Sequence, residues 1–196
     1  MSTTKMLERK TLLWLVPCVI ILLILPQFVK GYTIYIIDLI GVYALVALGL
    51  NLLTGYCGQL SLGHAAFFAI GAFGSASLTA NLGMPFWIAM PVAGLMGAVI
   101  ALLVGIPVLR LKQIFLAIAT IGLGVATGDI LYYWESISGS GNGIPVLKPT
   151  LGAFTFSSDE SYFYIILVAL IILTLVLRNI TKTKAGRAFL AIRESE

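Results

Sequence analysis

The stretch Pro85–Leu109, PFWIAMPVAGLMGAVIALLVGIPVL, decides the fold class, because its 25 residues include no charged side chain. A helix needs about 20 predominantly apolar residues to cross the hydrocarbon core of a bilayer, so this run predicts a transmembrane helix. Further runs of similar character are Thr11–Val29, Tyr32–Leu53, Ser61–Ala80, Gln113–Trp134 and Tyr162–Leu177. Together the runs predict an all-α, polytopic membrane protein with about six transmembrane helices.

The composition supports the same fold class and excludes several others. Hydrophobic residues make up 60% of the 196 residues and charged residues 10%, whereas a soluble domain is about half apolar and about a quarter charged. So much apolar surface does not fit inside one water-soluble core. The composition therefore excludes a nucleic-acid-binding module, a disulfide-rich secreted domain and an ordinary cytosolic enzyme.

The distribution of Lys and Arg predicts the orientation in the membrane. With the N-terminus in the cytoplasm and six crossings, ten of these residues lie inside and two, Lys30 and Lys148, lie outside. Basic residues are enriched in cytoplasmic segments. The expected organisation is a cytoplasmic tail at 1–10, a transmembrane domain at 11–177 with an extracytoplasmic loop at 135–161, and a cytoplasmic segment at 178–196. The run Ser61–Ala80, rich in small residues, is expected to cross fully, although a broken or re-entrant helix remains an alternative.

No motif for catalysis, nucleotide binding or metal binding is present. The sequence contains no G-x-x-x-x-G-K-[ST] and no G-x-S-x-G or H-E-x-x-H, so we expect neither ATP hydrolysis nor another catalytic activity from this chain alone. One histidine, His64, and two distant cysteines, Cys18 and Cys57, are too few for a zinc site. We expect this chain to bind no cofactor or metal, and both cysteines to be packing residues.

Polar groups within the apolar runs are candidates for a solute pathway, because each is costly in lipid unless it has a partner or water. Asp38 and Asn51 lie in the second run, and the segment Gly49–His64 is unusually rich in glycine and polar residues. This segment is either a tight cytoplasmic turn, which composition favours, or a broken helix along the pathway. Ser61 is the expected N-cap of the next helix. The candidate pathway residues are Asp38, Asn51, Gly58, Gln59, Ser61, Gly63 and His64.

The C-terminal segment Thr181–Glu196 has the pattern of an amphipathic helix. Four apolar residues at helical spacing form one stripe: Ala185, Ala188, Phe189 and Ile192. Basic residues flank this stripe. The segment is either an interfacial helix that lies on the membrane or a helix that docks in the groove of a partner protein.

Several stretches resemble the membrane permease subunits of bacterial ABC importers for branched-chain amino acids. The resemblance extends over most of the chain and is most specific at its first and last stretches: Gly49–Phe73 (GLNLLTGYCGQLSLGHAAFFAIGAF), Leu109–Gly122 (LRLKQIFLAIATIG), Trp134–Ile144 (WESISGSGNGI) and Gly186–Glu196 (GRAFLAIRESE). Within the family, the pattern is more similar to the LivM-type subunit than to its LivH-type partner.

The resemblance implies a heteromeric, ATP-driven importer in the bacterial inner membrane. A second permease subunit of the LivH type would complete the pore, and two cytoplasmic ATPase subunits would bind ATP and Mg²⁺. A periplasmic or lipid-anchored binding protein would deliver leucine, isoleucine or valine. The segment at the C-terminus corresponds to the family's coupling loop, which inserts into the ATPase. The residues that the resemblance assigns to this ATPase coupling are Gly186, Arg187, Ala188, Phe189, Ala191, Ile192, Arg193 and Glu194.

The resemblance also has departures and leaves alternatives open. Cys57 stands where the family more often has a small residue, and the sequence stops at Glu196, within the expected coupling loop. Family members continue beyond this point, so we expect a fragment or a shortened subunit. The same machinery transports urea or short-chain amides in similar permeases. Two further alternatives are a channel or carrier that needs no ATPase and a non-transporting membrane scaffold. The match of residues 186–196 to the coupling loop counts against both, because neither would need such a loop.

Overall fold

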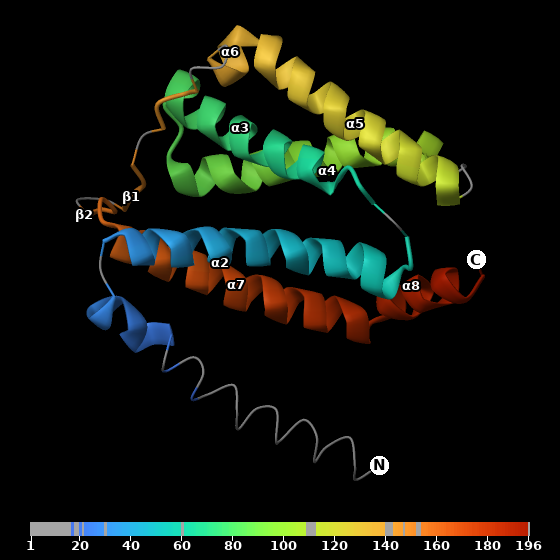
Figure 1. The fold of residues 1–196 in the computed structure, drawn as a ribbon, viewed down its shortest axis with the longest axis horizontal. Coiled ribbons are helices and arrows are strands. Elements are labelled where there is room, and N and C mark those ends of the chain that lie inside the picture. Colours follow the sequence, from blue (N-terminus) through green and yellow to red (C-terminus); the bar gives the residue numbers. More distant parts are fainter. Residues whose placement is uncertain are drawn as a thin grey trace. The chain divides into compact units, whose positions relative to one another are not determined.

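The computed structural model describes Pro17, Ile20 and residues 22–29, 31–59, 61–108, 113–139, 143–146, 148–151 and 154–195. Most of this part of the chain is helical (Figure 1). Its elements are α2 (Tyr32–Asn51), the π-helix η1 (Leu52–Tyr56), α3 (His64–Leu82), α4 (Phe86–Val108), α5 (Gln113–Tyr133), α6 (Glu135–Ser138), β1 (Thr150–Leu151), β2 (Phe154–Thr155), α7 (Asp159–Lys182) and α8 (Lys184–Ser195).

Five helices of the described part are long and apolar enough to cross a membrane. They are Tyr32–Tyr56, which joins α2 to η1, then His64–Leu82, Phe86–Val108, Phe115–Tyr133 and Asp159–Lys182. The expected all-α, multi-pass fold class is therefore confirmed. The predicted tail at 1–10 and most of the predicted span Thr11–Val29 lie outside the described residues, although residues 22–28 are helical.

Two predicted segments have different bounds in the structure. The last span, predicted as Tyr162–Leu177, extends over Asp159–Lys182. Asp159 and Glu160 lie in the first turn of α7 and Lys182 in its last turn. Each charge stabilises the helix there by its favourable interaction with the helix dipole. The predicted loop at 135–161 contains the short helix α6 and an antiparallel hairpin in which Thr150 pairs with Thr155 and Leu151 with Phe154.

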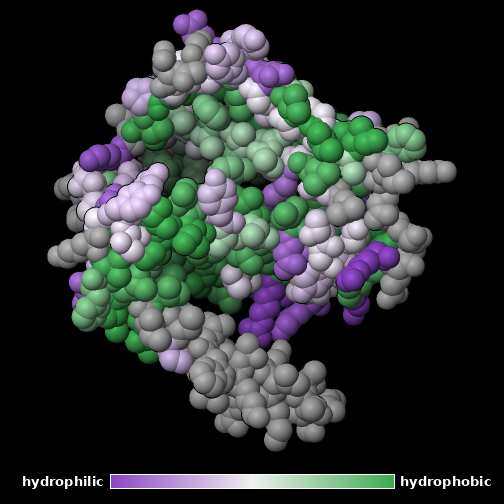
Figure 2. All heavy atoms as spheres, viewed as in Figure 1, coloured by the Kyte–Doolittle hydropathy of each residue, from purple (hydrophilic) through white to green (hydrophobic). Residues whose placement is uncertain are grey.

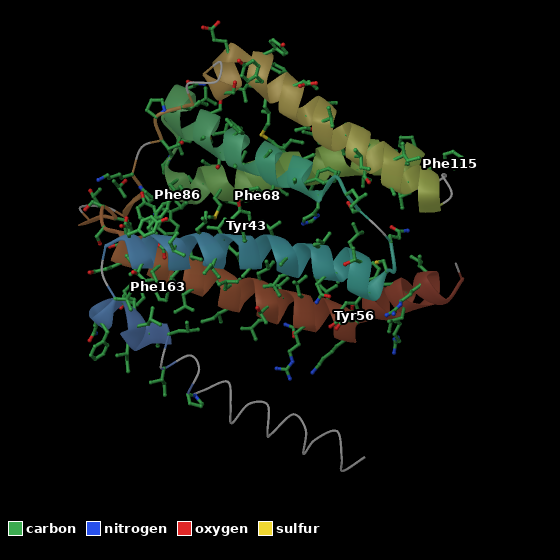
Figure 3. All side chains as sticks on the ribbon, in the orientation of Figure 1. Tyr43, Tyr56, Phe68, Phe86, Phe115 and Phe163 are labelled. Carbon is green, nitrogen blue, oxygen red and sulfur yellow. The ribbon has the colours of Figure 1, made fainter. Side chains whose placement is uncertain are left out.

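The chain divides into two compact units, and α2 and α7 contribute to both. The first unit contains the described residues within Met1–Leu45 and Ser158–Ile172. Its core is Ile34, Phe163 and Leu167, with Leu22, Leu25 and Ile37 packed around them; Phe163 is labelled in Figure 3. The helices α2 and α7 approach closely here: Gly41 leaves so little space that an added Cβ atom would lie 2.6 Å from Cγ2 of Ile166.

The second unit, Val46–Ser157 with Leu173–Glu196, is built on α3, α4 and α5. Small residues allow α3 and α4 to approach closely: Ala89 and Ala93 are 0% and 2% exposed, and Ala76 is 9% exposed. Helices in lipid associate through such close packing, because burial of apolar groups from water contributes nothing there. Of the small residues of α3, Ala76 is buried in the structure, whereas Ala72 is exposed.

Large apolar side chains remain exposed along the membrane helices of the described part. On α4 these include Leu95, Leu102 and Leu103, which are 65% to 68% exposed, and apolar residues cover much of the face seen in Figure 2. In water this surface would promote aggregation. In a bilayer it is the surface that lipid tails or other membrane helices contact.

The hairpin is attached to the start of α4. The indole Nε1 of Trp87 donates a hydrogen bond to the carbonyl oxygen of Thr150 at 2.9 Å, and its ring packs edge-on against Phe156 with 5.8 Å between centroids. Nearby, the Asn81 side-chain amide donates to the carbonyl oxygen of Ser136 at 2.8 Å. The segment between α5 and α7 thus folds against the ends of α3 and α4.

The packing of α3 against α4 predicts a contrast between two alanines of the same helix. Replacement of Ala93 by leucine should overpack the interface and destabilise the protein by about 1–3 kcal/mol. Ala98 is exposed, and Ala98→Leu should change stability little. The thermal unfolding midpoint of each purified variant measures the difference. Equal midpoints for the two variants would contradict the assigned α3–α4 interface.

Candidate functional site

The connection between α2 and α3 is the segment in which sequence analysis placed most candidate pathway residues. The helix α2 continues without interruption into η1, and the chain leaves helical conformation at Cys57. We call residues 57–59 and 61–63 the connector. Two backbone hydrogen bonds of 3.3 Å end η1, from the amide of Cys57 to the carbonyl of Leu52 and from the amide of Gln59 to the carbonyl of Leu53.

The far end of the connector is held against α5. The amide of Leu62 donates a hydrogen bond to Oγ1 of Thr120 at 3.2 Å, and that hydroxyl donates to the carbonyl of Ala117 at 2.8 Å. Gly63 is buried, and a Cβ atom there would overlap the carbonyl oxygen of Thr120. Glycine is therefore required at this position by the close approach of the two backbones.

The predicted N-cap of α3 is wrong. The structure has Gly63 at the cap position, without a side-chain hydrogen bond, and α3 begins at His64. Ser61 lies two residues earlier and lines a pocket instead. The physical reason is the attachment to Thr120: the amide of Leu62 and the backbone of Gly63 pack on α5 before the helix begins, which leaves Ser61 upstream of the cap.

A pocket of about 260 Å³ lies beside the connector. Three of the predicted pathway residues, Gln59, Ser61 and His64, line it together. The rest of its wall comes from η1 and from helices α3, α4 and α5 and is mostly apolar: Leu53, Phe67, Ala101, Val104, Gly105, Val108, Leu116, Ala119, Thr120 and Leu123. The pocket thus combines an aliphatic wall with a few hydrogen-bonding side chains, which is the usual composition of a small-molecule site.

Gly58 and Gly63 belong to the connector without lining this pocket, and the other two predicted pathway residues lie elsewhere. Asn51, the last residue of α2, lines a separate pocket of about 200 Å³ with Tyr56 (labelled in Figure 3), Arg178 and Thr181. Asp38 belongs to the first unit, and its Oδ1 is buried without a hydrogen-bond partner among the described residues. The structure therefore gathers three of the seven candidates in one pocket and does not bring Asn51 into it.

The walls that α4 and α5 contribute to the pocket were not predicted from the sequence. Thr120 is a hydroxyl residue within an apolar run, and Ala101 and Gly105 are small residues one turn apart. Such signals are weak, because small residues and Thr also occur in ordinary helix packing within membranes. The contact with the connector becomes visible only when α5 is placed beside it.

The helix α8 begins directly after α7, with a bend at Thr183. The Thr183 hydroxyl donates to the carbonyl of Ile180 at 2.7 Å, which pairs one of the last carbonyls of α7. Gly186 is buried, and a Cβ atom there would overlap the carbonyl oxygen of Thr181. The tight fold of α8 against the end of α7 therefore requires glycine at 186. The segment Thr181–Glu196 was predicted to be an amphipathic helix, and the structure has a helix there from Lys184 to Ser195.

The surface of α8 has two distinct sides. Arg187, Ala188 and Ala191 are exposed, as is Ile192, and Phe189 is partly buried; the side chain of Glu194 lies outside the described residues. On the other side, Arg193 Nη1 donates a hydrogen bond to the carbonyl oxygen of Gly55 in η1 at 3.0 Å. A Cβ atom at Gly58 would lie 2.9 Å from Cγ of Arg193. The helix therefore contacts its own chain on one side and leaves the other uncovered in the described structure.

Comparisons with known proteins identify the family of this chain. The sequence profile of the family described as "Branched-chain amino acid transport system / permease component" matches residues 32–196. The chain belongs to this family. It is 36% identical over 211 aligned positions to the high-affinity branched-chain amino acid transport system permease protein LivM of Escherichia coli (strain K12). It is 34% identical to the protein of the same name from Salmonella typhimurium (strain LT2).

Each alignment covers 95% of this chain and 50% of the relative. The chain therefore spans about half the length of the curated relatives it matches. No solved structure matches it. The relatives are named as transport permeases rather than enzymes, and the resemblance of this sequence to the LivM type is confirmed.

The connector also carries a cysteine that can report on its packing. Cys57 is 7% exposed, and burial raises the pKa of its thiol. Because the thiolate is the form that reacts with maleimides, less of Cys57 is reactive at a given pH than of an ordinary thiol. No group of three His, Cys, Asp or Glu residues in the described part of the chain is placed to hold a metal ion.

The raised pKa of Cys57 predicts the pH dependence of its labelling. In a Cys18→Ser background, the maleimide labelling rate should reach half its maximum at a higher pH for Cys57 than for an exposed thiol. The matched control is Asn179→Cys in a background without Cys18 and Cys57, since Asn179 is exposed on α7. Rates measured from pH 6 to about pH 10 give both curves. Coincident curves would contradict the burial of Cys57.

Proposed function

We propose that this permease forms half of the translocation pathway of an ATP-driven importer for leucine, isoleucine and valine. The observation that carries the proposal is the exposed side of α8 in a chain that belongs to a branched-chain amino acid permease family. An amphipathic helix with an uncovered face is a common docking element for a groove on another protein. In this proposal the groove belongs to an ATPase subunit.

The proposed ATPase contact uses the outward side of α8. Ala188 and Ala191 are small and exposed, so a partner surface can approach the helix closely there, and the guanidinium of Arg187 can bond carboxylates. This permease contains no phosphate-binding loop. ATP and Mg²⁺ would therefore be bound by two separate ATPase subunits, and movement of those subunits would drive the permease through α8.

The proposed pathway passes the connector. The aliphatic wall of the 260 Å³ pocket suits a branched apolar side chain, and Gln59, Ser61 and His64 supply hydrogen-bonding groups. Gly58 and Gly63 shape the backbone on either side of Gln59 and Ser61, and His64 follows Gly63 directly. Asn51 lines the adjacent small pocket, and Asp38 is an ionisable group within a membrane helix, a position that is usually functional.

The proposed assembly and orientation follow from the distribution of charge. Both termini would lie in the cytoplasm of a bacterial cell, with residues 135–161 outside. A second permease subunit of the LivH type would complete the pore. The periplasmic or lipid-anchored binding protein would then contact the outer segment that contains α6 and the hairpin.

The assembly can be tested by co-expression of the permease with the ATPases, the second permease and the binding protein encoded beside it. We expect the ATPases to co-purify with the permease and radiolabelled leucine to accumulate in membrane vesicles that are supplied with ATP. Competition by excess urea or acetamide, without competition by isoleucine, would instead identify an amide importer. Leucine uptake that needs no ATP would contradict the ATP-driven mechanism.

The docking proposal predicts a sharp effect of charge on the outward side of α8. Ala188→Glu or Ala191→Glu should abolish co-purification of the ATPases, because a desolvated and unpaired carboxylate at the interface costs several kcal/mol. Membrane insertion of the permease should be unchanged. Asn179→Glu is the matched control, since it adds the same charge to the exposed end of α7. An intact complex with both α8 variants would show that the ATPases bind elsewhere.

A further inference from the structure

We propose that Arg193 does not dock the ATPase but is a positioning residue, which ties α8 to the connector and transmits the movement of α8 to the pocket. This inference rests on the proposed function, because it needs an ATPase that moves α8. The inference gives Arg193 a role different from that of Arg187, Ala188 and Ala191, which are proposed to contact the ATPase. The assignment depends on three features of the structure: the end of η1, the path of the connector, and the sides of α8.

The first feature is the unpaired end of a helix. The last carbonyl groups of a helix have no partner within it and carry a partial negative charge. At the end of η1, the carbonyls of Leu52 and Leu53 accept hydrogen bonds from the connector. The carbonyl of Gly55 accepts its hydrogen bond from the guanidinium of Arg193, 138 residues away in the sequence. A charged donor is well suited to this position, since such bonds are stronger than neutral ones.

The second feature is the path of the connector past the Arg193 stem. Gly58 has a φ of +73°, a conformation that side chains disfavour, and its Cα faces Cγ of Arg193 so closely that a Cβ atom would lie 2.9 Å away. Arg193 thus contacts the chain on both sides of Cys57, at Gly55 through its guanidinium and at Gly58 through its stem. Cys57 between them is buried.

The third feature is the position of Arg193 on α8. It follows Gly186 by seven residues, which is close to two helical turns, so both residues lie on the same side of the helix. Gly186 packs against the backbone of Thr181 and Arg193 against η1. This side of α8 therefore contacts the chain itself at both ends, at the buried Gly186 and at Arg193, which bonds η1 although it is exposed. Arg187, Ala188 and Ala191 are also exposed.

These contacts form a short route from α8 to the pocket. Arg193 holds the start of the connector, and Thr120 of α5 holds its end through Leu62 and Gly63. Gln59 and Ser61, which lie between these attachments, line the pocket. A displacement of α8 pulls on the start of the connector while its end stays on α5. The side chains that move in consequence are those of Gln59 and Ser61 in the pocket wall.

The first experiment tests the contact itself with Cys57 as the reporter, in a Cys18→Ser background. Arg193→Gln should increase the maleimide labelling rate of Cys57 by about threefold to tenfold, as expected when one charge-assisted hydrogen bond is lost. Arg193→Lys, which keeps a cationic donor, should restore a rate near that of the parent. Arg187→Gln is the matched control, since Arg187 lies about 120° from Arg193 around the helix axis, and it should leave the rate unchanged.

A second variant reaches the same contact from the connector. Gly58→Ala should displace the Arg193 stem and also strain the backbone, so it should raise the Cys57 labelling rate as Arg193→Gln does. Gly71→Ala is its control, since a Cβ atom at Gly71 meets nothing within 4 Å. Agreement between Gly58→Ala and Arg193→Gln distinguishes loss of the contact from general misfolding, in which the Gly71 variant would also label rapidly.

The second experiment tests the coupling role in the assembled transporter. Arg193→Gln should retain the ATPases on purification, whereas Ala188→Glu loses them. Leucine uptake per ATP hydrolysed should fall by about tenfold in Arg193→Gln, as expected when transmission rather than docking is lost. Arg193→Lys should recover most of the uptake.

Each remaining outcome overturns the inference in a distinct way. An unchanged Cys57 labelling rate in Arg193→Gln would show that the contact does not hold the connector. Loss of the ATPases in Arg193→Gln would place Arg193 in the docking surface. If the ATPases do not bind even the parent permease, the proposed function fails. Increased labelling of Cys57 in Arg193→Gln would in that case still show that Arg193 contacts the connector, but the coupling role of Arg193 would be overturned.

Discussion

The need to pair every backbone polar group away from water is the constraint on which the structure of this chain depends. Long helices satisfy it within each membrane span, and difficulties arise only where a helix ends. The end of η1 and the start of α3 are such places. Their freed groups find partners on distant elements, with the carbonyl of Gly55 on Arg193 and the amide of Leu62 on Thr120. The pairing of backbone groups thus accounts for the long helices, whereas the two bonds that join the connector to α5 and α8 form at exposed helix ends.

Close approach between backbones is a second constraint, and it explains why glycine occurs at particular positions. Gly63 lies against the backbone of Thr120 and Gly186 against that of Thr181, where any side chain would overlap main-chain atoms. Gly58 combines a left-handed backbone with a near contact to Arg193. Composition alone treats these residues as flexible turn formers. In the structure they mark the sites where elements far apart in the sequence are held together.

The fold class was predictable from the sequence because the signal for a membrane helix is strong. A run of apolar residues long enough to span lipid has few alternative structures, and the bounds of α3, α4 and α5 lie within a few residues of those predicted. The helical stripe at the C-terminus likewise predicted α8. The site was less predictable. Gln59, Ser61 and His64 were identified as unusual polar residues, yet their common pocket depends on α4 and α5, whose contributions are mostly ordinary aliphatic side chains.

The sequence by itself determined the membrane helices, their amphipathic C-terminal neighbour and the family of the permease, since these depend on local composition and on motifs. Only the tertiary structure decided which side of α8 meets its own chain. Arg187 and Arg193 look equivalent in the sequence, as two cations beside one apolar stripe. They differ because α8 folds back at Gly186 and brings Arg193 to the end of η1. A hydrogen bond between residues 138 positions apart depends on how helices pack, which no local pattern encodes.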